Sequence, residues 1–336
     1  YTNADMTSMV TPSGQTITYG YTNHQITSIA VNGTTVISGV TYDPFGSASG
    51  WTWGNGTTTT RAFDEDGNPQ QIVTAGVTNS YTVDSASRIT GLSDSGLTSN
   101  SFTFGYDALD RVTSGTSSTT TRGYTYDANG NWLSETGTQH FTTTISGTSN
   151  QLNSTAGQQP QTFTYDAAGN TTSYNGATFT FYQRGRFSSR TVTGGTTNYY
   201  YNAMNEMIGK SGAGGIQYLM YDEAGHLISE YGITNPIEDT VWMGDIPVAV
   251  IQKSGASFVV YYVHTDHLNT PRKVTRPSDN ALMWRWDPDT YGMPQPNSNP
   301  SGLGTFTFNQ RFAGQYFRNE SWMFMNYYRA YNPQQG

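Results

Sequence analysis

The chain has 336 residues, a formal net charge of −8 and only 16 Lys plus Arg, so it lacks the clustered basic residues that a nucleic-acid partner requires. It contains no cysteine, which excludes a disulfide framework, a CxxC redox pair and a cysteine-based zinc site. No apolar run reaches the roughly 18 residues of a membrane-spanning helix, so we expect no membrane span.

One short phrase recurs along residues 40–227. It consists of an aromatic residue, Asp, two small or acidic residues, Gly or Asp, and then a polar residue. Its clear copies begin at Tyr42-Asp43, Phe63-Asp64, Tyr106-Asp107, Tyr126-Asp127, Tyr165-Asp166 and Tyr221-Asp222. A fixed period of about 20 residues is typical of one supersecondary unit stacked on copies of itself. The phrase therefore predicts a repeat architecture.

The spacing of the Asp position locates the degenerate copies. From Asp43 to Asp127 the successive Asp residues lie 21, 20, 23 and 20 residues apart, whereas Asp166 lies 39 residues after Asp127. A copy that has lost Tyr-Asp is therefore expected near residue 147. The first forty residues resemble degenerate copies of the same unit. Farther along the chain, the pattern places at the Asp position Gln183, Asn202 and Asp222.

Each copy alternates apolar and polar residues before its turn. Phe102, Phe104 and Tyr106 share one face of a strand. In the turn, the Asp carboxylate accepts backbone N–H groups and a late Gly tolerates positive φ. We therefore predict an all-β fold with almost no helix, in which stacked hairpins of about 20 residues form a long antiparallel sheet that spirals into a shell or solenoid. The alternative is a β-propeller with two units in each blade of roughly 40–50 residues.

The final hundred residues contain a different series of phrases. In chain order they are Val241–Val250, Tyr262–Arg272, Trp286–Gly292, Arg311–Phe317 and Asn326–Pro333. Together with the Tyr-Asp phrases, this series resembles the YD repeats and core-associated region of Rhs proteins, which are related to teneurins and to the shell-forming components of insecticidal toxin complexes. The resemblance implies a YD-repeat hairpin array over residues 1–240 and a core-associated region over residues 241–336 that continues the same sheet.

The same resemblance implies a hollow β-shell around an unfolded or loosely folded toxin, closed by an aspartyl protease that severs the cargo. One catalytic Asp is expected shortly after the phrase that contains Arg311 and Gly314, and the second in a later Asp-Pro-x-Gly-Leu phrase. Here Arg318 follows that phrase, Glu320 is the nearest acid, and the usual Tyr-Asp-Pro reads Tyr-Asn332-Pro. The sequence ends at residue 336 without Asp-Pro-x-Gly-Leu. Because an amide cannot exchange the required proton at neutral pH, we predict that this chain is not an enzyme and does not cleave itself.

A second candidate site is the group His264, Asp266 and His267. On a strand His264 and Asp266 face one way and His267 the other, so the three converge on a metal only if a turn intervenes. The following Leu-Asn-Thr-Pro segment supplies a turn signal. A hydrogen-bonded structural corner is the favoured interpretation, a metal site is the alternative, and we expect neither a metal nor a cofactor.

Exposed aromatic residues would form a carbohydrate platform, because their rings pack on sugar faces. The candidates are Trp51, Trp53, Tyr199, Tyr200 and Tyr201. Packing of these rings within the sheet is the alternative. The segment Met283–Trp286 is interpreted as a half-buried strand, and the prolines that follow it predict a long irregular loop.

Two functions fit these observations. The first is a structural shell segment of a secreted bacterial protein whose partner is its own C-terminal polypeptide. The second is an extracellular structural or adhesive protein without cargo, which pairs with copies of itself in a fibre or coat, or with a cell-surface glycan. Because the chain begins at Tyr1 with neither Met nor a signal-like segment, we expect it to be a fragment or a processed piece.

Overall fold

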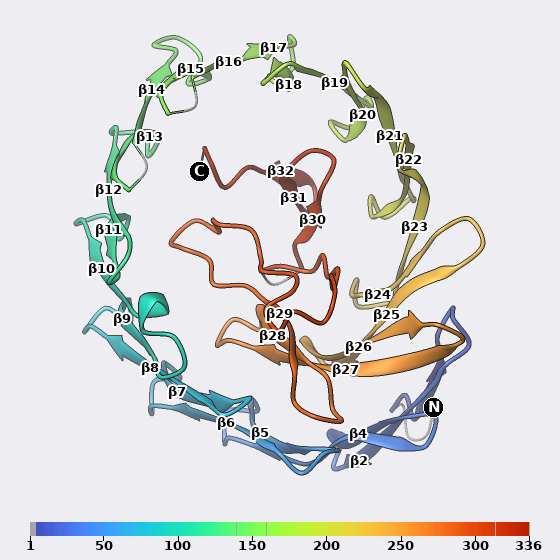
Figure 1. Cartoon of the computed structure of the whole chain (residues 1–336). Helices are drawn as coiled ribbons and strands as arrows, with labels where there is room; N and C mark the ends of the chain where they lie inside the picture. The colour runs from blue at the N-terminus through green and yellow to red at the C-terminus, as the bar shows by residue number, and fades with distance from the viewer. Residues whose placement is uncertain (1–4, 139, 159, 313, 336) are drawn as a thin grey trace. The chain divides into compact units, whose positions relative to one another are not determined.

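The structure is a computed structural model, and it describes residues 5–138, 140–158, 160–312 and 314–335. Its strands follow one another in chain order in long antiparallel sheets (Figure 1), which confirms the predicted all-β class. The one helical element within those ranges is a single 3-10 turn, η1 (Thr98–Asn100). No helix in the same ranges is long and apolar enough to cross a bilayer.

The first sheet has 16 strands in the order of the chain. They are β1 (Ser8–Val10), β2 (Thr16–Thr22), β3 (Gln25–Val31), β4 (Thr34–Tyr42), β5 (Ala48–Trp53), β6 (Thr58–Phe63), β7 (Pro69–Thr74), β8 (Val77–Val83), β9 (Ile89–Asp94), β10 (Phe102–Tyr106), β11 (Val112–Thr116), β12 (Thr121–Tyr126), β13 (Trp132–Gly137), β14 (Phe141–Ile145), β15 (Leu152–Gly157) and β16 (Gln161–Thr162). Because this run of strands is not divided into four-stranded blades, the propeller alternative is wrong.

The second sheet has 13 strands, again in chain order, and the third has three. The second consists of β17 (Thr164–Tyr165), β18 (Thr171–Tyr174), β19 (Ala177–Phe181), β20 (Phe187–Val192), β21 (Gly195–Tyr201), β22 (Met207–Gly212), β23 (Gly215–Tyr221), β24 (Leu227–Tyr231), β25 (Pro236–Met243), β26 (Ile246–Ser254), β27 (Ser257–Thr265), β28 (Pro271–Thr275) and β29 (Leu282–Arg285). The third consists of β30 (Tyr316–Arg318), β31 (Met323–Asn326) and β32 (Arg329–Tyr331).

The two long sheets divide within one extended segment, residues 161–165. Its first half pairs with β15 and its second half with β18, and only Phe163 separates the two halves. A second departure concerns residues 241–336, which were expected to continue one sheet throughout. The sheet runs only to Arg285, because the proline-rich segment that follows has few backbone donors in register and forms an irregular loop. That loop was predicted.

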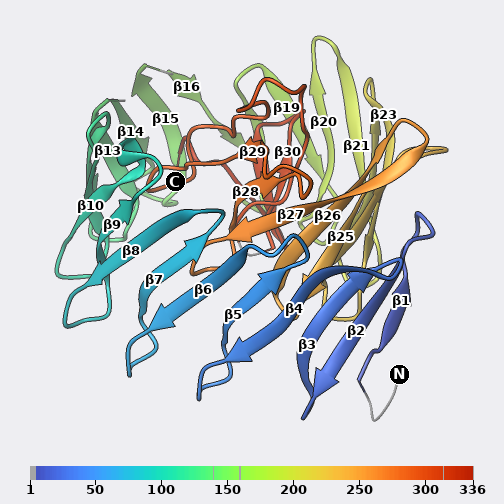
Figure 2. The same cartoon turned by 60° about the horizontal axis from the view of Figure 1, so that its bottom comes forward.

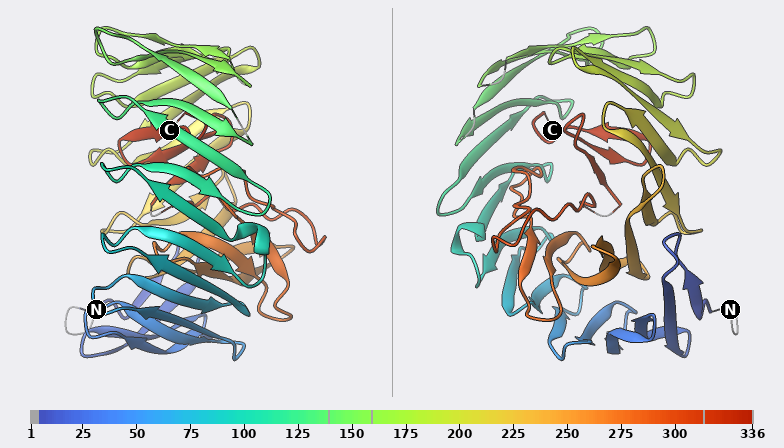
Figure 3. Two further views of the ribbon diagram at one scale, coloured as in Figure 1. Left: turned by 90° about the vertical axis from the view of Figure 1, so that its left-hand side faces the viewer. Right: turned by 45° about the vertical axis from the view of Figure 1, so that its right-hand side comes forward.

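The chain forms two compact units. Unit 1 comprises Tyr1–Tyr81, Gln217–Pro288 and Gly292–Phe317, and unit 2 comprises Thr82–Ile216, Asp289–Tyr291 and Arg318–Gly336. In unit 1, β2 to β7 lie side by side as consecutive antiparallel strands (Figure 2), and in unit 2, β10 to β16 do the same (Figure 3). The predicted boundary after residue 240 falls inside β25.

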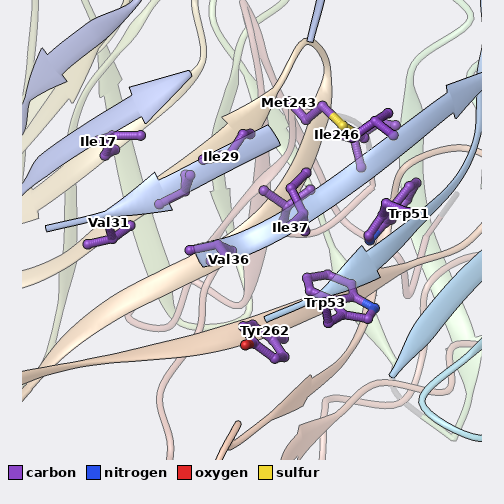
Figure 4. Packing of buried hydrophobic residues seen from close by; sticks show 14 of the residues in the cluster. Ile17, Ile29, Val31, Val36, Ile37, Trp51, Trp53, Met243, Ile246 and Tyr262 are labelled. Carbon is purple, nitrogen blue, oxygen red and sulfur yellow. The ribbon is translucent and has the colours of Figure 1, made fainter. Parts of the chain in front are cut away.

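Unit 1 has an aliphatic and aromatic core between two layers of strand. Side chains from β2 to β5 pack against side chains from β25 to β27 (Figure 4). Ile17 and Ile37 are fully buried, and the Trp53 indole stacks on the Tyr262 ring with 4.7 Å between centroids. One face of these strands is therefore buried away from water, as the alternation of apolar and polar residues predicts.

Candidate functional site: the Tyr-Asp turns and the C-terminal motif

The Tyr-Asp phrase builds a closed five-residue turn, of which Asp127 gives a clear example. The Asp127 N–H donates to the Asn131 carbonyl at 3.0 Å, and Oδ1 of its carboxylate accepts the N–H groups of Asn129 and Asn131 at 2.9 Å. Gly130 adopts φ +87°, the left-handed conformation that glycine adopts without a Cβ penalty. The same two carboxylate contacts recur at Asp43, Asp64, Asp84, Asp107, Asp166, Asp222 and Asp266.

The tyrosine of the phrase fastens one repeat to the preceding one. Its hydroxyl donates to the carbonyl of the apolar residue that follows the previous turn. The donor and acceptor residues are Tyr42 to Ile26 at 2.8 Å, Tyr106 to Ile89 at 2.6 Å, Tyr126 to Val112 at 2.6 Å and Tyr165 to Leu152 at 2.7 Å. These four Tyr-Asp pairs thus have two structural contacts, one inside their own turn and one to the repeat before it.

These hydrogen bonds also set the ionisation of the turn carboxylates. The largest cause is a hydrogen bond from the side chain four residues later, and backbone N–H donors add to it. Together they hold the pKa below its usual value at Asp64, Asp84, Asp107, Asp127 and Asp166. A carboxylate with a lowered pKa stays ionised at neutral pH and is a poor general acid.

Two degenerate copies test whether the spacing of the repeat locates turns that have lost the Tyr-Asp pair. At the copy expected near residue 147, Ser146 takes the Asp position and its N–H donates to the Gln151 carbonyl at 2.7 Å, which confirms the prediction. At the later copy, the N–H of Tyr182 donates to the Arg186 carbonyl at 2.8 Å. Tyr182 therefore occupies the Asp position, and the assignment of Gln183 was wrong by one residue because Phe181 is the aromatic residue of that copy.

The His264 group belongs to one of these turns. Asp266 accepts the N–H groups of Leu268 and Thr270 at 2.9 and 3.0 Å, as the other turn aspartates do. His264 is buried, and its two ring nitrogens lie 2.7 Å from Thr74 Oγ1 and 2.8 Å from Thr275 Oγ1. Burial lowers the pKa of His264 to about 3, so the ring is neutral.

The third member of the group points elsewhere. The His267 ring packs edge-on against Tyr81 with centroids 4.7 Å apart, and burial lowers its pKa. Among the residues that the structure describes, no three His, Asp or Glu side chains converge as a metal site requires. The arrangement in this part of the chain is a hydrogen-bonded corner.

Arg311 lies in the core of unit 1. Its guanidinium sits 5.1 to 5.3 Å from the ring centroids of Trp284, Trp286 and Phe317, and Nη1 donates to the Phe308 carbonyl at 2.7 Å. Burial lowers the pKa of Arg311 to about 9. Gly314, with φ +78°, closes the turn in which the Arg311 N–H donates to the Gln315 carbonyl. Ala313, within the same phrase, lies outside the described residues.

In unit 2, the two positions where the family resemblance expects acid chemistry are Arg318 and Glu320. Arg318 is 1% exposed and lies 5.0 and 4.9 Å from the ring centroids of Phe187 and Tyr199. Glu320 pairs with Lys210 Nζ at 2.8 Å and accepts the Tyr199 hydroxyl at 3.0 Å. Burial raises the pKa of Glu320, but the charge and hydrogen bond of Lys210 outweigh it and the net shift is downward.

Two buried charge clusters were missed from the sequence. In unit 1, Glu230 and Glu238 face each other across β24 and β25, and Tyr316 OH donates to Glu230 at 3.0 Å. Burial and the neighbouring Glu230 raise the pKa of Glu238 well above its usual value. Acids at non-turn strand positions, in a chain with only 12% charged residues, were the available signal.

The second missed cluster lies in unit 2. Arg122 pairs through Nη1 with Glu135 at 2.7 Å and through Nη2 with Asp289 at 2.6 Å, and all three side chains are buried. Burial, reinforced by the Asp289 charge, raises the pKa of Glu135 to about 7 despite the opposing effect of Arg122. Nothing local in the sequence connects Asp289 to residues 122 and 135.

The proposed aromatic platform is largely core. Trp51 and Trp53 are 4% and 1% exposed in unit 1, and Tyr199 is fully buried in unit 2. Tyr200 is exposed and Tyr201 is half-buried. Because one face of each strand must pack against other side chains, alternate rings are turned inward, and the platform prediction is wrong for three of its five rings.

Comparison with known proteins agrees with this geometry. Residues 77–336 match the Teneurin YD-shell family. The chain belongs to the teneurin YD-shell family. A curated relative of this YD-shell chain, Toxin protein Tse5 of Pseudomonas aeruginosa, is 31% identical over 91 residues, which cover 27% of this chain and 6% of the relative.

Solved structures extend the likeness of the YD-shell fold to nearly the whole chain. A structure of the Photorhabdus luminescens Tc holotoxin pore matches with a TM-score of 0.74 and 15% identity, and covers 98% of this chain and 19% of that one. The crystal structure of TcdB2-TccC3 matches with a TM-score of 0.76 and 16% identity, and covers 98% and 20% respectively. The chain thus spans about a fifth or less of each of these relatives.

Proposed function

We propose that this chain is a non-enzymatic structural segment of a secreted YD-repeat β-shell, and that the shell encloses the polypeptide that follows it in the complete protein. The observation that carries the proposal is the YD-shell match over residues 77–336. It agrees with the long antiparallel sheets, in which the tyrosines of four Tyr-Asp pairs bond to the preceding repeat. The titratable residues of the C-terminal motif support a structural role, because Glu320 is engaged by Lys210 and Arg318 by aromatic rings.

Protection of the downstream polypeptide tests the enclosing role. The complete gene product is treated with a nonspecific protease, with the downstream polypeptide expressed alone as the control. We expect the enclosed polypeptide to be cleaved much more slowly than the free one. Equal cleavage rates, or filaments rather than hollow particles in electron micrographs, would contradict enclosure and favour a fibre or coat built from copies of the chain.

A separate measurement tests the absence of catalysis. The chain with its natural downstream sequence is incubated at neutral pH and followed by mass spectrometry. We expect no released C-terminal fragment. Release that Glu320→Gln abolishes, with the variant still folded, would show that Glu320 is a catalytic acid after all.

A further inference from the structure

Two glutamates lie side by side in the interior of unit 1. Glu230 of β24 and Glu238 of β25 are register partners, so their side chains project from the same face of the sheet, and they are 1% and 3% exposed. A hydrogen bond joins the two carboxyl groups. Because an ionised carboxylate only accepts hydrogen bonds, this bond requires a proton on one of the two acids. The contact therefore exists only while the pair holds that proton.

The surrounding donors indicate which acid carries the proton. Oε2 of Glu230 accepts two hydrogen bonds, from the Tyr316 hydroxyl at 3.0 Å and from Gln217 Nε2. Oε2 of Glu238 accepts one, from Gln252 Nε2 at 2.8 Å. Since each donated hydrogen bond favours the ionised form of a carboxyl group, Glu230 is the better carboxylate. Glu238 is then the acid that donates to it.

The charges around the pair do not favour a second carboxylate. β23 and β26 each contribute a neutral glutamine to it. Asp239, next to the pair on β25, points to the opposite face, where Ser229 Oγ donates to it at 2.7 Å, and its negative charge favours protonation of the pair. Residues 306–317 contribute the Tyr316 hydroxyl and the guanidinium of Arg311, whose positive charge acts on both acids. One cation offsets one carboxylate, so ionising both acids would leave an uncompensated buried charge.

Both acids also fasten the segment that covers them. We call residues 306–312 and 314–317 the strap. Tyr316 of the strap donates to Glu230, and Gln252 Nε2 donates both to Glu238 and to the carbonyl of Thr307 at 2.7 Å. A third hydrogen bond joins the strap to β25, from Gln310 Nε2 to Thr240 Oγ1 at 2.7 Å. Two of these three fastenings thus pass through the acid pair.

We propose that the Glu230–Glu238 pair is a proton-dependent latch, which holds the strap on β24 to β26 while the pair shares one proton and lets the strap separate from the sheet when that proton is lost to water. Loss of the proton breaks the bond between the acids and places a second negative charge in the interior. Separation of the strap admits water to both carboxylates and relieves that charge. The latch lies within unit 1 and does not depend on the proposed enclosing role.

The direction of the pH effect follows from linkage. In the separated form the acids are in water, where a glutamate has a pKa of about 4.3. The closed form therefore binds one more proton above that pH, and its stability falls as pH rises until the pKa of the closed pair is reached. A bound cation in place of the proton fits less well. Hard cations take six or more oxygen ligands, and within the described residues no third acidic or histidine side chain joins the pair.

Hydrogen exchange of the whole chain between about pH 6 and pH 8, corrected for the intrinsic exchange rate at each pH, tests the latch. We expect the protection of strap amides to fall about tenfold or more over this range, which is about 1.4 kcal/mol. Protection in β2 to β5 of the same unit is the internal reference and should change by less than about threefold.

Glu238→Gln is the decisive variant, because its amide still donates to Glu230 but has no proton to lose. Its strap protection should stay within about threefold across the same pH range. Glu223→Gln, at an exposed turn of unit 1, is the matched control and should retain the fall. If Glu238→Gln does not fold, Glu230→Gln replaces it with the same expectation, since its amide oxygen can accept the donors of Glu230 and its nitrogen can donate to Glu238.

Infrared spectroscopy supplies a direct measurement of the proton. At neutral pH we expect a carbonyl stretching band of a protonated carboxyl group, part of which Glu238→Gln removes. An unchanged band would overturn the proposal, as would strap protection that does not depend on pH or that falls equally in the glutamine variant. A rise in strap protection on adding calcium at about pH 8, abolished by Glu238→Gln, would also overturn it, because the pair would then be a cation site.

Discussion

Unit 1 and unit 2 are built from the same Tyr-Asp hairpin but fill their interiors differently. In unit 1, strands β2 to β5 pack on β25 to β27 through aliphatic and aromatic side chains, and Ile17, Ile29 and Ile37 are fully buried. Unit 2 has fewer buried aliphatic residues and holds the Arg122 ion cluster and an amide-lined cavity. The turns are equivalent, so the difference shows that the repeat determines the strands and the intervening residues determine what fills the interior of each unit.

The largest expected effect is in the core of unit 1. Trp53→Ala removes a 1% exposed indole stacked on Tyr262 and should lower the free energy of unfolding by about 3–5 kcal/mol. Chemical denaturation gives the magnitude, and hydrogen exchange should show faster opening of β2 to β5. Trp322→Ala, at a 58% exposed ring, is the control. Equal losses in the two variants would contradict the assignment of the core.

The corresponding test in unit 2 removes the centre of its ion cluster. Arg122→Met removes the guanidinium that pairs with the buried Glu135 and Asp289 carboxylates and should cost about 3 kcal/mol. Replacing all three residues with apolar ones should restore most of the loss, because no buried charge then remains. If the triple variant is as unstable as the single one, lost packing and not unpaired charge is the cause.

Two buried groups, His264 in unit 1 and Glu135 in unit 2, should contribute to the pH dependence of stability with opposite signs. The pKa of His264 falls from 6.5 to about 3 on folding, so the unfolded state binds an extra proton and this group lowers the stability of unit 1 as pH falls below about 6.5. The pKa of Glu135 rises from 4.5 to about 7, so the folded state binds the extra proton and unit 2 gains stability as pH falls from about 7 to 4.5.

Hydrogen exchange at several pH values, followed in peptides of each unit, measures how the free energy of unfolding of that unit changes with pH, which is the slope compared below. His264→Asn should flatten the slope in unit 1, and Glu135→Gln should flatten the slope in unit 2. A pH dependence that His264→Asn or Glu135→Gln leaves unchanged would show that other groups, such as Glu238 in unit 1 or the turn carboxylates, dominate it instead.

The smallest expected effect is on a single fastening contact. Tyr106→Phe removes the hydroxyl that donates to the Ile89 carbonyl at 2.6 Å and should cost about 1 kcal/mol. Tyr200→Phe, at a 46% exposed ring whose hydroxyl pairs with Ser211 Oγ, should change stability by a few tenths of a kcal/mol. Thermal unfolding measures the melting temperature of both variants. An equal fall in melting temperature in Tyr106→Phe and Tyr200→Phe would contradict a role of Tyr106 in joining adjacent repeats.

Local chemistry made much of the architecture predictable. The Asp carboxylate and a left-handed residue three positions later define the Tyr-Asp turns. The period also locates the copy at Ser146, whose turn is one residue longer and has its left-handed residue at Asn150. The assignment failed at Gln183, because two adjacent aromatic residues, Phe181 and Tyr182, both fit the phrase and only the register of β19 with β20 distinguishes them. The prediction of an aromatic platform was wrong for a related reason, because the presence of an aromatic residue does not show which face of its strand is buried.

The sequence by itself determined the class of fold, the repeat and its turns, because a five-residue turn and strand alternation depend on neighbours along the chain. Only the tertiary structure decided the rest. It joined Arg122 to Asp289, brought the Tyr316 hydroxyl onto Glu230 and paired Glu320 with Lys210. These contacts join residues from distant or separate hairpins, and their burial and charge arise from packing that no local pattern encodes.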